Sequence, residues 1–215
     1  IPWLCKIHLT QNEHVWFNKP HDILLYDRPT LDWLQNTQYN HILLGNPNDK
    51  IDKSYPWIFW SRSPKQLEHI RHNIIPYQQR HINSIFIGKI ENSIQDKFRN
   101  NNQYQNYIEF YQMMNQNQKY KYSQIEYLKL LSYSKFGLCL RGYGPKCNRE
   151  IELLALGTIP LITKDVDLTY YNDLIEGKHY YLINHPQDID YYIFNTNEEK
   201  WNEMSQNCIR WYENN

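Results

Sequence analysis

The chain has 215 residues, enough for one sizeable hydrophobic core or for two small lobes. Its 23 basic and 23 acidic side chains balance, and its pI is near 7.2. This balance argues against bulk nucleic-acid binding and against a polybasic membrane surface, and no apolar run approaches the ~18 residues that a membrane span needs.

The start of the chain, its cysteines and its lack of sequons bear on the protein context and the cellular compartment that we expect. There is no initiator Met and no visible signal peptide, so we expect a domain of a longer protein. The four cysteines show no metal-ligand spacing, and Cys139 falls in an apolar run typical of a buried strand. The absence of Asn-x-Ser/Thr sequons favours a cytoplasmic location, with the Golgi lumen as the alternative.

The first third of the chain predicts a small α/β lobe. Apolar runs near residues 23–26 and 42–44 are predicted strands, and a short helix is expected between them, near residues 30–34. Residues 46–56 are polar and rich in turn residues, and a further helix is expected from Ser63 to Ile70. We assign residues 1–75 to this lobe.

A second α/β unit is expected over residues 76–215. It opens with a strand at residues 84–87, followed by Gly88 and Lys89 and then by a helix that ends at Arg99. An amphipathic helix over residues 123–132 leads to the most informative stretch of the chain, Ser134 to Lys164.

That stretch predicts strand, loop, helix and strand in succession. Residues 136–140 form an apolar run of strand length, and Gly142, Gly144 and Pro145 mark a loop. A helix over residues 149–156, with Asn148 as its N-cap, ends at Gly157, and residues 159–163 form a second buried strand. Two parallel strands joined by a crossover helix are the natural interpretation.

Such a loop lies at the carboxyl end of a strand and the amino end of a helix, where free backbone N–H groups attract anions. Arg141, Lys146 and Arg149 add positive charge there, and Glu152 can accept hydrogen bonds from sugar hydroxyls. A diphosphate beside a ribose would satisfy all of these groups. The spacing of these residues also allows an alternative interpretation. In it, Arg141 and Lys146 are surface charges and Glu152 is a solvated helix residue.

The stretch resembles the donor-binding segment of exostosin-like glycosyltransferases, a family with the GT-B fold. That family carries a hydrophobic strand, Pro-Arg-Gly, a glycine-containing loop and then Arg-x-x-Glu-Ala-Leu-x-x-Gly-x-x-Pro-Val. Here Leu140-Arg141-Gly142 takes the first place, with Leu where the family often has Pro, and REIELLALGTIPL at residues 149–161 takes the second. The resemblance covers residues 134–164 well and residues 165–175 loosely.

The resemblance implies roles for individual residues. Glu152 would hold the nucleotide ribose, and Arg141 and Arg149 would lie near the diphosphate. Lys89 and Arg99 correspond to basic residues that open the family's donor lobe, although Arg99 is equally well explained as a helix-surface cation. The residues expected to line the donor crevice are Lys89, Arg141, Gly142, Gly144, Glu152 and Asp165.

Two further features lie in the C-terminal part of the chain. Asp165 and Asp167 follow a predicted strand and either contact donor sugar hydroxyls or cap the next turn. A strand is expected at residues 179–183. Apolar residues then recur at helical spacing and predict a helix packed on the sheet: Trp201, Met204, Cys208 and Trp211.

The fold class expected is therefore α/β and GT-B-like, with two Rossmann-like lobes built on parallel sheets. The resemblance implies an inverting transfer from a UDP- or GDP-linked sugar to a hydroxyl of a glycan or glycoprotein, without a metal or other cofactor. An N-terminal carboxylate or His would act as the base. The candidates are Glu13, His14, Asp22 and Asp27, and Asp27 is preferred because it follows a strand and precedes Pro29. The alternatives are a non-catalytic nucleotide-sugar or glycan-binding module and an unrelated α/β phosphate-binding protein.

Overall fold

The computed structural model describes residues 58, 60–88, 107, 122–141 and 146–215, together with the backbone of strands at 22–25, 41–44 and 54–55. The helices expected at 30–34 and 93–99 lie outside the described residues. Contacts divide the chain into two compact units, Ile1–Trp57 and Ile58–Asn215. The division lies earlier than the boundary at residue 75 drawn from the sequence, because helix α3 (Pro64–Arg71) packs against helices of the second unit.

The first unit contains a three-stranded parallel sheet in the order β1-β2-β3. Its strands are β1 (Asp22–Leu25), β2 (His41–Leu44) and β3 (Ser54–Tyr55). The sequence predicted the first two and their place in one sheet, and both predictions are confirmed. Strand β3 was missed, because only two residues of a polar stretch enter the ladder.

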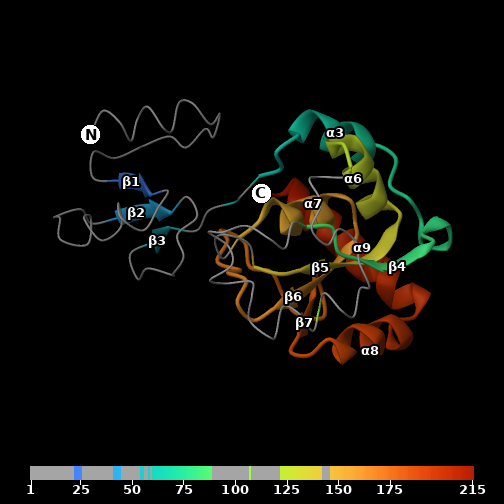
Figure 1. Ribbon diagram of the computed structural model, residues 1–215. Coiled ribbons are helices and arrows are strands. Elements are labelled where there is room, and N and C mark those ends of the chain that lie inside the picture. The colour runs from blue at the N-terminus through green and yellow to red at the C-terminus, as the bar shows by residue number, and fades with distance from the viewer. Residues whose placement is uncertain are drawn as a thin grey trace. The chain divides into compact units, whose positions relative to one another are not determined.

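The second unit is built on a four-stranded parallel sheet in the order β4-β5-β6-β7 (Figure 1). The sequence predicted a parallel sheet here, but not the number or the order of its strands. The strands are β4 (Ile82–Ile85), β5 (Ser134–Cys139), β6 (Ile159–Thr163) and β7 (Tyr181–Ile183). All five residues of β6 are buried, as the long apolar run predicts for a strand covered on both faces.

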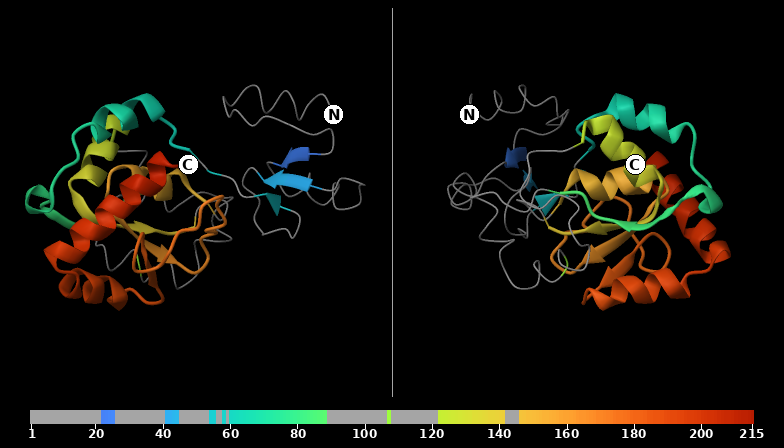
Figure 2. Two further views of the ribbon diagram at one scale, coloured as in Figure 1. Left: turned by 180° about the vertical axis from the view of Figure 1, so that it is seen from behind. Right: turned by 45° about the vertical axis from the view of Figure 1, so that its right-hand side comes forward.

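Helices cover both faces of this sheet (Figure 2). Side chains of α3, of α6 (Gln124–Ser132) and of α7 (Asn148–Ala155) pack with Cys139 and Ile162 on one face. Side chains of α8 (Gln187–Asn195) and of the first turns of α9 (Glu198–Glu213) pack with Phe136 and Leu138 on the other. The alternation of Phe136 and Leu138 with Cys139 follows from the two-residue period of a strand.

Helix α9 joins the two layers. Its predicted apolar stripe is confirmed, since Trp201, Met204, Cys208 and Trp211 are all buried. Trp201 and Met204 contact the sheet, whereas Cys208 and Trp211 pack against α7. Gly157, at the end of α7, has φ 64°, and a Cβ there would lie 2.5 Å from Ser205 Oγ on α9, so only glycine fits this crossing.

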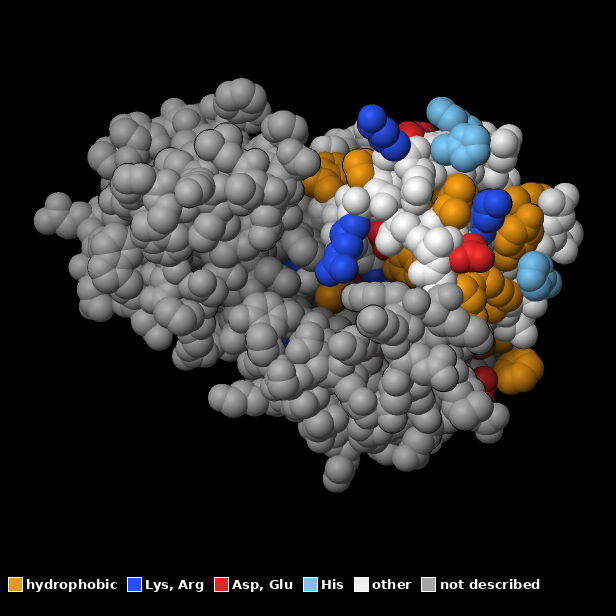
Figure 3. Space-filling model, turned by 45° about the horizontal axis from the view of Figure 1, so that its top comes forward, with side chains coloured by type: hydrophobic (Ala, Val, Ile, Leu, Met, Phe, Trp, Pro, Cys, Tyr) orange, Lys and Arg blue, Asp and Glu red, His pale blue; other side chains and the backbone are white. Residues whose placement is uncertain are grey.

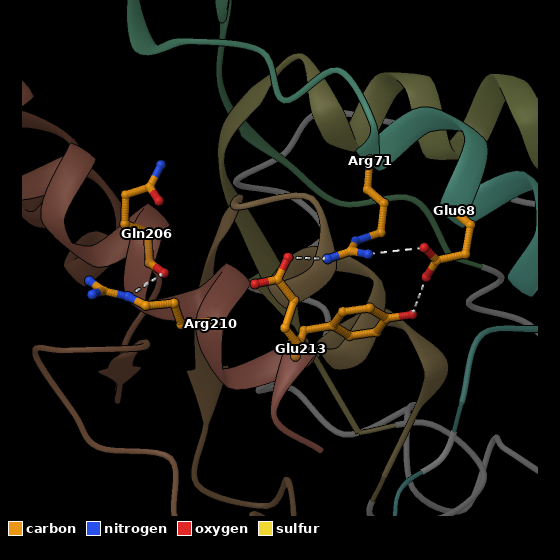
Figure 4. A network of polar contacts seen from close by, with 6 residues as sticks. Glu68, Arg71, Gln206, Arg210 and Glu213 are labelled. Atoms are coloured by element: carbon orange, nitrogen blue, oxygen red, sulfur yellow. Dashed lines mark hydrogen bonds and ion pairs between the residues drawn. The ribbon is translucent and has the colours of Figure 1, made fainter.

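A polar network ties the end of α9 to α3 (Figure 4). The Arg71 guanidinium lies between two carboxylates, donating to Glu68 at 2.9 Å and to Glu213 at 2.7 Å. The Tyr212 hydroxyl donates to the second oxygen of Glu68 at 3.0 Å. Both carboxylates are about half exposed, so water competes for these contacts and each is worth little to stability.

A buried arginine holds the starts of three strands together. Arg80, directly before β4, is 2% exposed. Its donors reach four acceptors at 2.7–2.9 Å: the carbonyls of Ile75, Ser134 and Leu156 and the hydroxyl of Thr158. Burial lowers the pKa of Arg80 to about 9, so the guanidinium remains charged at neutral pH and its hydrogen bonds stay charge-assisted.

Replacing Arg80 with Met should therefore lower the free energy of unfolding by at least about 3 kcal/mol, because several buried acceptors lose their donor together. Urea unfolding of the wild type and the variant measures this difference. Arg71→Met is the matched control and should cost about 1 kcal/mol or less, since its partners are exposed. Equal losses in the two variants would show that Arg80 does not hold the sheet.

Candidate functional site

The candidate site lies at the carboxyl edge of the four-stranded sheet. In parallel sheets the carboxyl ends of neighbouring strands meet at one edge, where ligands of open α/β proteins bind. Here the segments that leave β4, β5 and β6 meet the amino end of α7 at that edge (Figure 1). Arg141, which is half-buried, follows the end of β5 after Leu140.

Arg149 connects α7 to the end of β4. Its guanidinium lies over the Phe86 ring, 4.6 Å from the centroid, and Nη2 donates to the Ile87 carbonyl at 2.7 Å. A Cβ at Gly88 would lie 2.8 Å from the same Nη2, so the absence of a side chain at Gly88 leaves room for the guanidinium. Nε of Arg149 is buried and has no hydrogen-bond partner among the described residues. Arg149 therefore has one N–H whose hydrogen-bonding capacity the described residues leave unused.

Glu152 lies one turn further along α7 and is 2% exposed. Its Oε1 accepts from the Ser61 hydroxyl at 2.7 Å, and its Oε2 accepts from the Tyr127 hydroxyl at 2.9 Å. Burial raises the pKa of Glu152, while the two hydroxyl donors oppose that rise. The alternative interpretation from spacing, a solvated helix residue, is wrong for Glu152, because the segment before α3 and helix α6 cover it.

Lys146 also lies inside the protein and is 1% exposed. Its ammonium group lies over the Tyr170 ring, 4.3 Å from the centroid, and donates to the Thr169 carbonyl. A surface charge is therefore the wrong interpretation of Lys146 as well. The contacts link the start of α7 to the loop after β6.

The sequence analysis missed a buried carboxyl group at the start of α7. Glu150 is fully buried, and its Oε2 accepts the backbone N–H of Cys147 at 2.7 Å, which makes Cys147 the N-cap in place of the predicted Asn148. Glu150 Oε1 has no hydrogen-bond partner among the described residues. A Glu three residues after the N-cap is the signal for this contact, but the usual Ser or Thr at the cap is absent here.

Burial raises the pKa of Glu150 from its ordinary value of 4.5 to about 7, although Arg149 opposes the rise. The folded protein thus keeps a proton that the unfolded chain releases, and stability should fall as the pH rises from about 4.5 to 7. Glu150→Gln removes this ionisation and keeps an oxygen for the Cys147 N–H. We expect the variant to gain melting temperature over the wild type at pH 8 but not at pH 5.

Thermal unfolding across this pH range measures the difference. Glu203→Gln on α9, where the carboxylate is 58% exposed, is the control and should follow the wild-type pH dependence. A Glu150→Gln variant that parallels the wild type at every pH would contradict the buried ionisation.

The loop after β6 carries the two predicted aspartates. Asp165 is exposed and accepts from the Thr163 hydroxyl at 2.6 Å. Asp167 accepts the backbone N–H of Thr169 at 2.8 Å, so it caps the turn, one of the two roles the sequence left open. Asp165 thus presents a carboxylate at the carboxyl end of β6.

Several predicted site residues lie outside the described residues: Glu13, His14, Asp27, Lys89, Arg99, Gly142 and Gly144. Asp22 belongs to the backbone of β1. The structure thus brings Arg149 and Glu152 together on α7, with Arg141, Lys146 and Asp165 on the segments beside it. Within the described ranges, no three His, Cys, Asp or Glu side chains form a group that could hold a metal ion.

The visible surface carries acidic and basic side chains side by side in its described part, in keeping with the balanced charge of the chain (Figure 3). No helix in the described part of the chain is long and apolar enough to cross a membrane. Neither models of known protein families nor curated proteins match the sequence.

Proposed function

We propose that the protein is a glycosyltransferase that moves a sugar from a UDP- or GDP-linked donor to a hydroxyl group of a glycan or glycoprotein. In this proposal the two units are the lobes of a GT-B enzyme, and the second unit binds the donor. The resemblance of residues 134–164 to exostosin-like enzymes motivates it, and the parallel α/β sheet of the second unit is compatible with it.

The position of Arg149 is the observation that supports the proposal most strongly. Its guanidinium lies at the carboxyl end of β4, beside the amino end of α7, with a buried Nε that has no partner among the described residues. A positive side chain beside a helix N-terminus is the arrangement that stabilises a leaving diphosphate without a metal ion.

The remaining residues take roles by their chemistry. Glu152 accepts from the ribose hydroxyls, Arg141 adds charge beside the diphosphate, and Asp165 contacts hydroxyls of the donor sugar.

In the transfer, a base removes the proton of the acceptor hydroxyl, and the oxygen attacks the anomeric carbon. The bond from that carbon to the diphosphate oxygen breaks, and the diphosphate leaves with the electron pair, inverting the anomeric centre. Asp27 remains the preferred base.

A thermal-shift panel of UDP-, GDP- and CMP-sugars tests the proposal, with the free nucleosides as controls. We expect a UDP- or GDP-sugar to raise the melting temperature, and the same donor to support sugar transfer or hydrolysis in excess EDTA. Binding without either reaction would favour the non-catalytic module. A protein that binds none of these donors contradicts the proposal, and activity that needs Mn²⁺ or Mg²⁺ contradicts its metal-free form.

Arg149→Ala should lower kcat/KM by about 100-fold, because charge builds on the diphosphate in the transition state and the variant loses a positioned donor. Its affinity for uridine or guanosine, which lack phosphate, should change by less than about threefold. Steady-state kinetics and calorimetry measure the two effects. Arg210→Ala on α9, whose donors stay within its own helix, is the control. If the variant loses turnover and nucleoside affinity to the same extent, Arg149 does not act on the diphosphate.

A further inference from the structure

The Glu152 carboxylate is already occupied by two hydroxyl groups of the protein. Ser61 donates to Oε1 at 2.7 Å and Tyr127 donates to Oε2 at 2.9 Å, and the Glu152 side chain is almost entirely excluded from solvent. Each oxygen could accept a second hydrogen bond, but the burial of the side chain leaves a ligand no path to either of them. A ligand hydroxyl can reach Glu152 only if one of the two donors leaves.

The two donors differ in how firmly they are held. Tyr127 belongs to α6, whose start is fixed by a capping box between Ser123 and Glu126, and its neighbour Leu128 is fully buried in the core. Ser61 instead lies on an irregular segment that precedes α3. Ser61 is therefore the donor that can be displaced without unfolding a helix.

In the described part of the chain, one hydrogen bond at each end holds the segment Trp60–Ser63. Asn148 Nδ2 on α7 donates to the Trp60 carbonyl, and the Ser63 carbonyl accepts the Leu67 N–H at the start of α3 at 3.0 Å. The Ser63 N–H donates to Ser61 Oγ at 3.2 Å within the segment itself. The Trp60 ring meets the Tyr212 ring edge-on at 6.0 Å between centroids and remains 46% exposed. Trp60 and Arg62 are exposed and Ser61 is the one buried residue of the segment, so moving the segment exposes little apolar area and costs little free energy.

We propose that the segment Trp60–Ser63 is an internal competitor for the ligand at Glu152. The Ser61 hydroxyl takes the place of a ribose hydroxyl in the unliganded protein, and a nucleotide displaces it. This inference rests on the proposed function, because it assigns Glu152 to the ribose. It explains how a carboxylate can be both buried and ligand-binding: Ser61 satisfies the charge until a sugar hydroxyl replaces it.

Removing the competitor should strengthen binding. In Ser61→Ala the ligand no longer breaks a hydrogen bond to a charged acceptor, so the Kd for UDP or GDP should fall about tenfold. The gain should vanish for the 2′,3′-dideoxy form of the same nucleotide, which has no ribose hydroxyls to offer Glu152. Calorimetry with the two nucleotides measures both effects. Ser63→Ala is the matched control, since the Ser63 side chain makes no cap hydrogen bond.

The outcomes separate this inference from the proposed function. If UDP or GDP binds the wild type and Ser61→Ala binds it equally or more weakly, the competitor role is wrong while the donor site stands. An equal gain for the dideoxy nucleotide would also overturn the role. If neither nucleotide binds the wild type or the variant, the proposed function fails, and the inference fails with it.

Hydrogen exchange on the wild type gives an independent test that does not depend on a folded variant. The amide of Ser63 donates to Ser61 Oγ, and it loses this acceptor when the Ser61 hydroxyl turns away from Glu152. We expect the amides of residues 60–63 to exchange faster with UDP or GDP bound, while amides of β5 are unchanged. Unchanged or slower exchange in the segment, with nucleotide bound, would overturn the inference.

Discussion

The Arg80 guanidinium is the interaction on which the second unit depends. It joins the segment before β4 to the starts of β5 and β6 through the carbonyls of Ser134 and Leu156 and the hydroxyl of Thr158. Thr158 in turn donates to the Leu131 carbonyl at the end of α6. Because the strands are parallel, holding their starts in register also aligns their carboxyl ends. The candidate site is therefore positioned from the opposite end of the sheet.

Helix α7 carries ionisable side chains at buried positions, where an ionised group costs free energy. Arg149, Glu150 and Glu152 lie within one turn of each other, and the two carboxyl groups are almost fully buried. Ionised side chains cost free energy when they leave water, and burial raises the pKa of both carboxyl groups. A helix that only packed on the sheet would be more stable with apolar residues at these positions. The arrangement is typical of a binding site, where perturbed ionisable groups gather.

The spacing of apolar residues predicted the helices and strands well where one or both faces of the element had to be apolar. The strands of the second sheet, helix α6 and the stripe on α9 were all expected, because burial imposes the two-residue and 3.6-residue periods directly on the residues. Helix α8 was missed, since its sequence QDIDYYIFN is rich in aromatic and β-branched residues that favour strands. The unit boundary was placed too late, because nothing local shows that α3 packs on α6 and α7.

The sequence by itself determined the α/β class, the parallel direction of the strands and the position of Arg141 and the start of α7 at a carboxyl edge. These follow from periodicity and turn chemistry, which act over a few residues. Only the tertiary structure decided that Lys146 is buried against Tyr170, that Glu150 is buried at the start of α7 and that Glu152 is covered by Ser61. The Ser61 hydroxyl and the Glu152 carboxylate are 91 residues apart in the chain. Contacts at that separation depend on how the layers pack, and no local pattern encodes them.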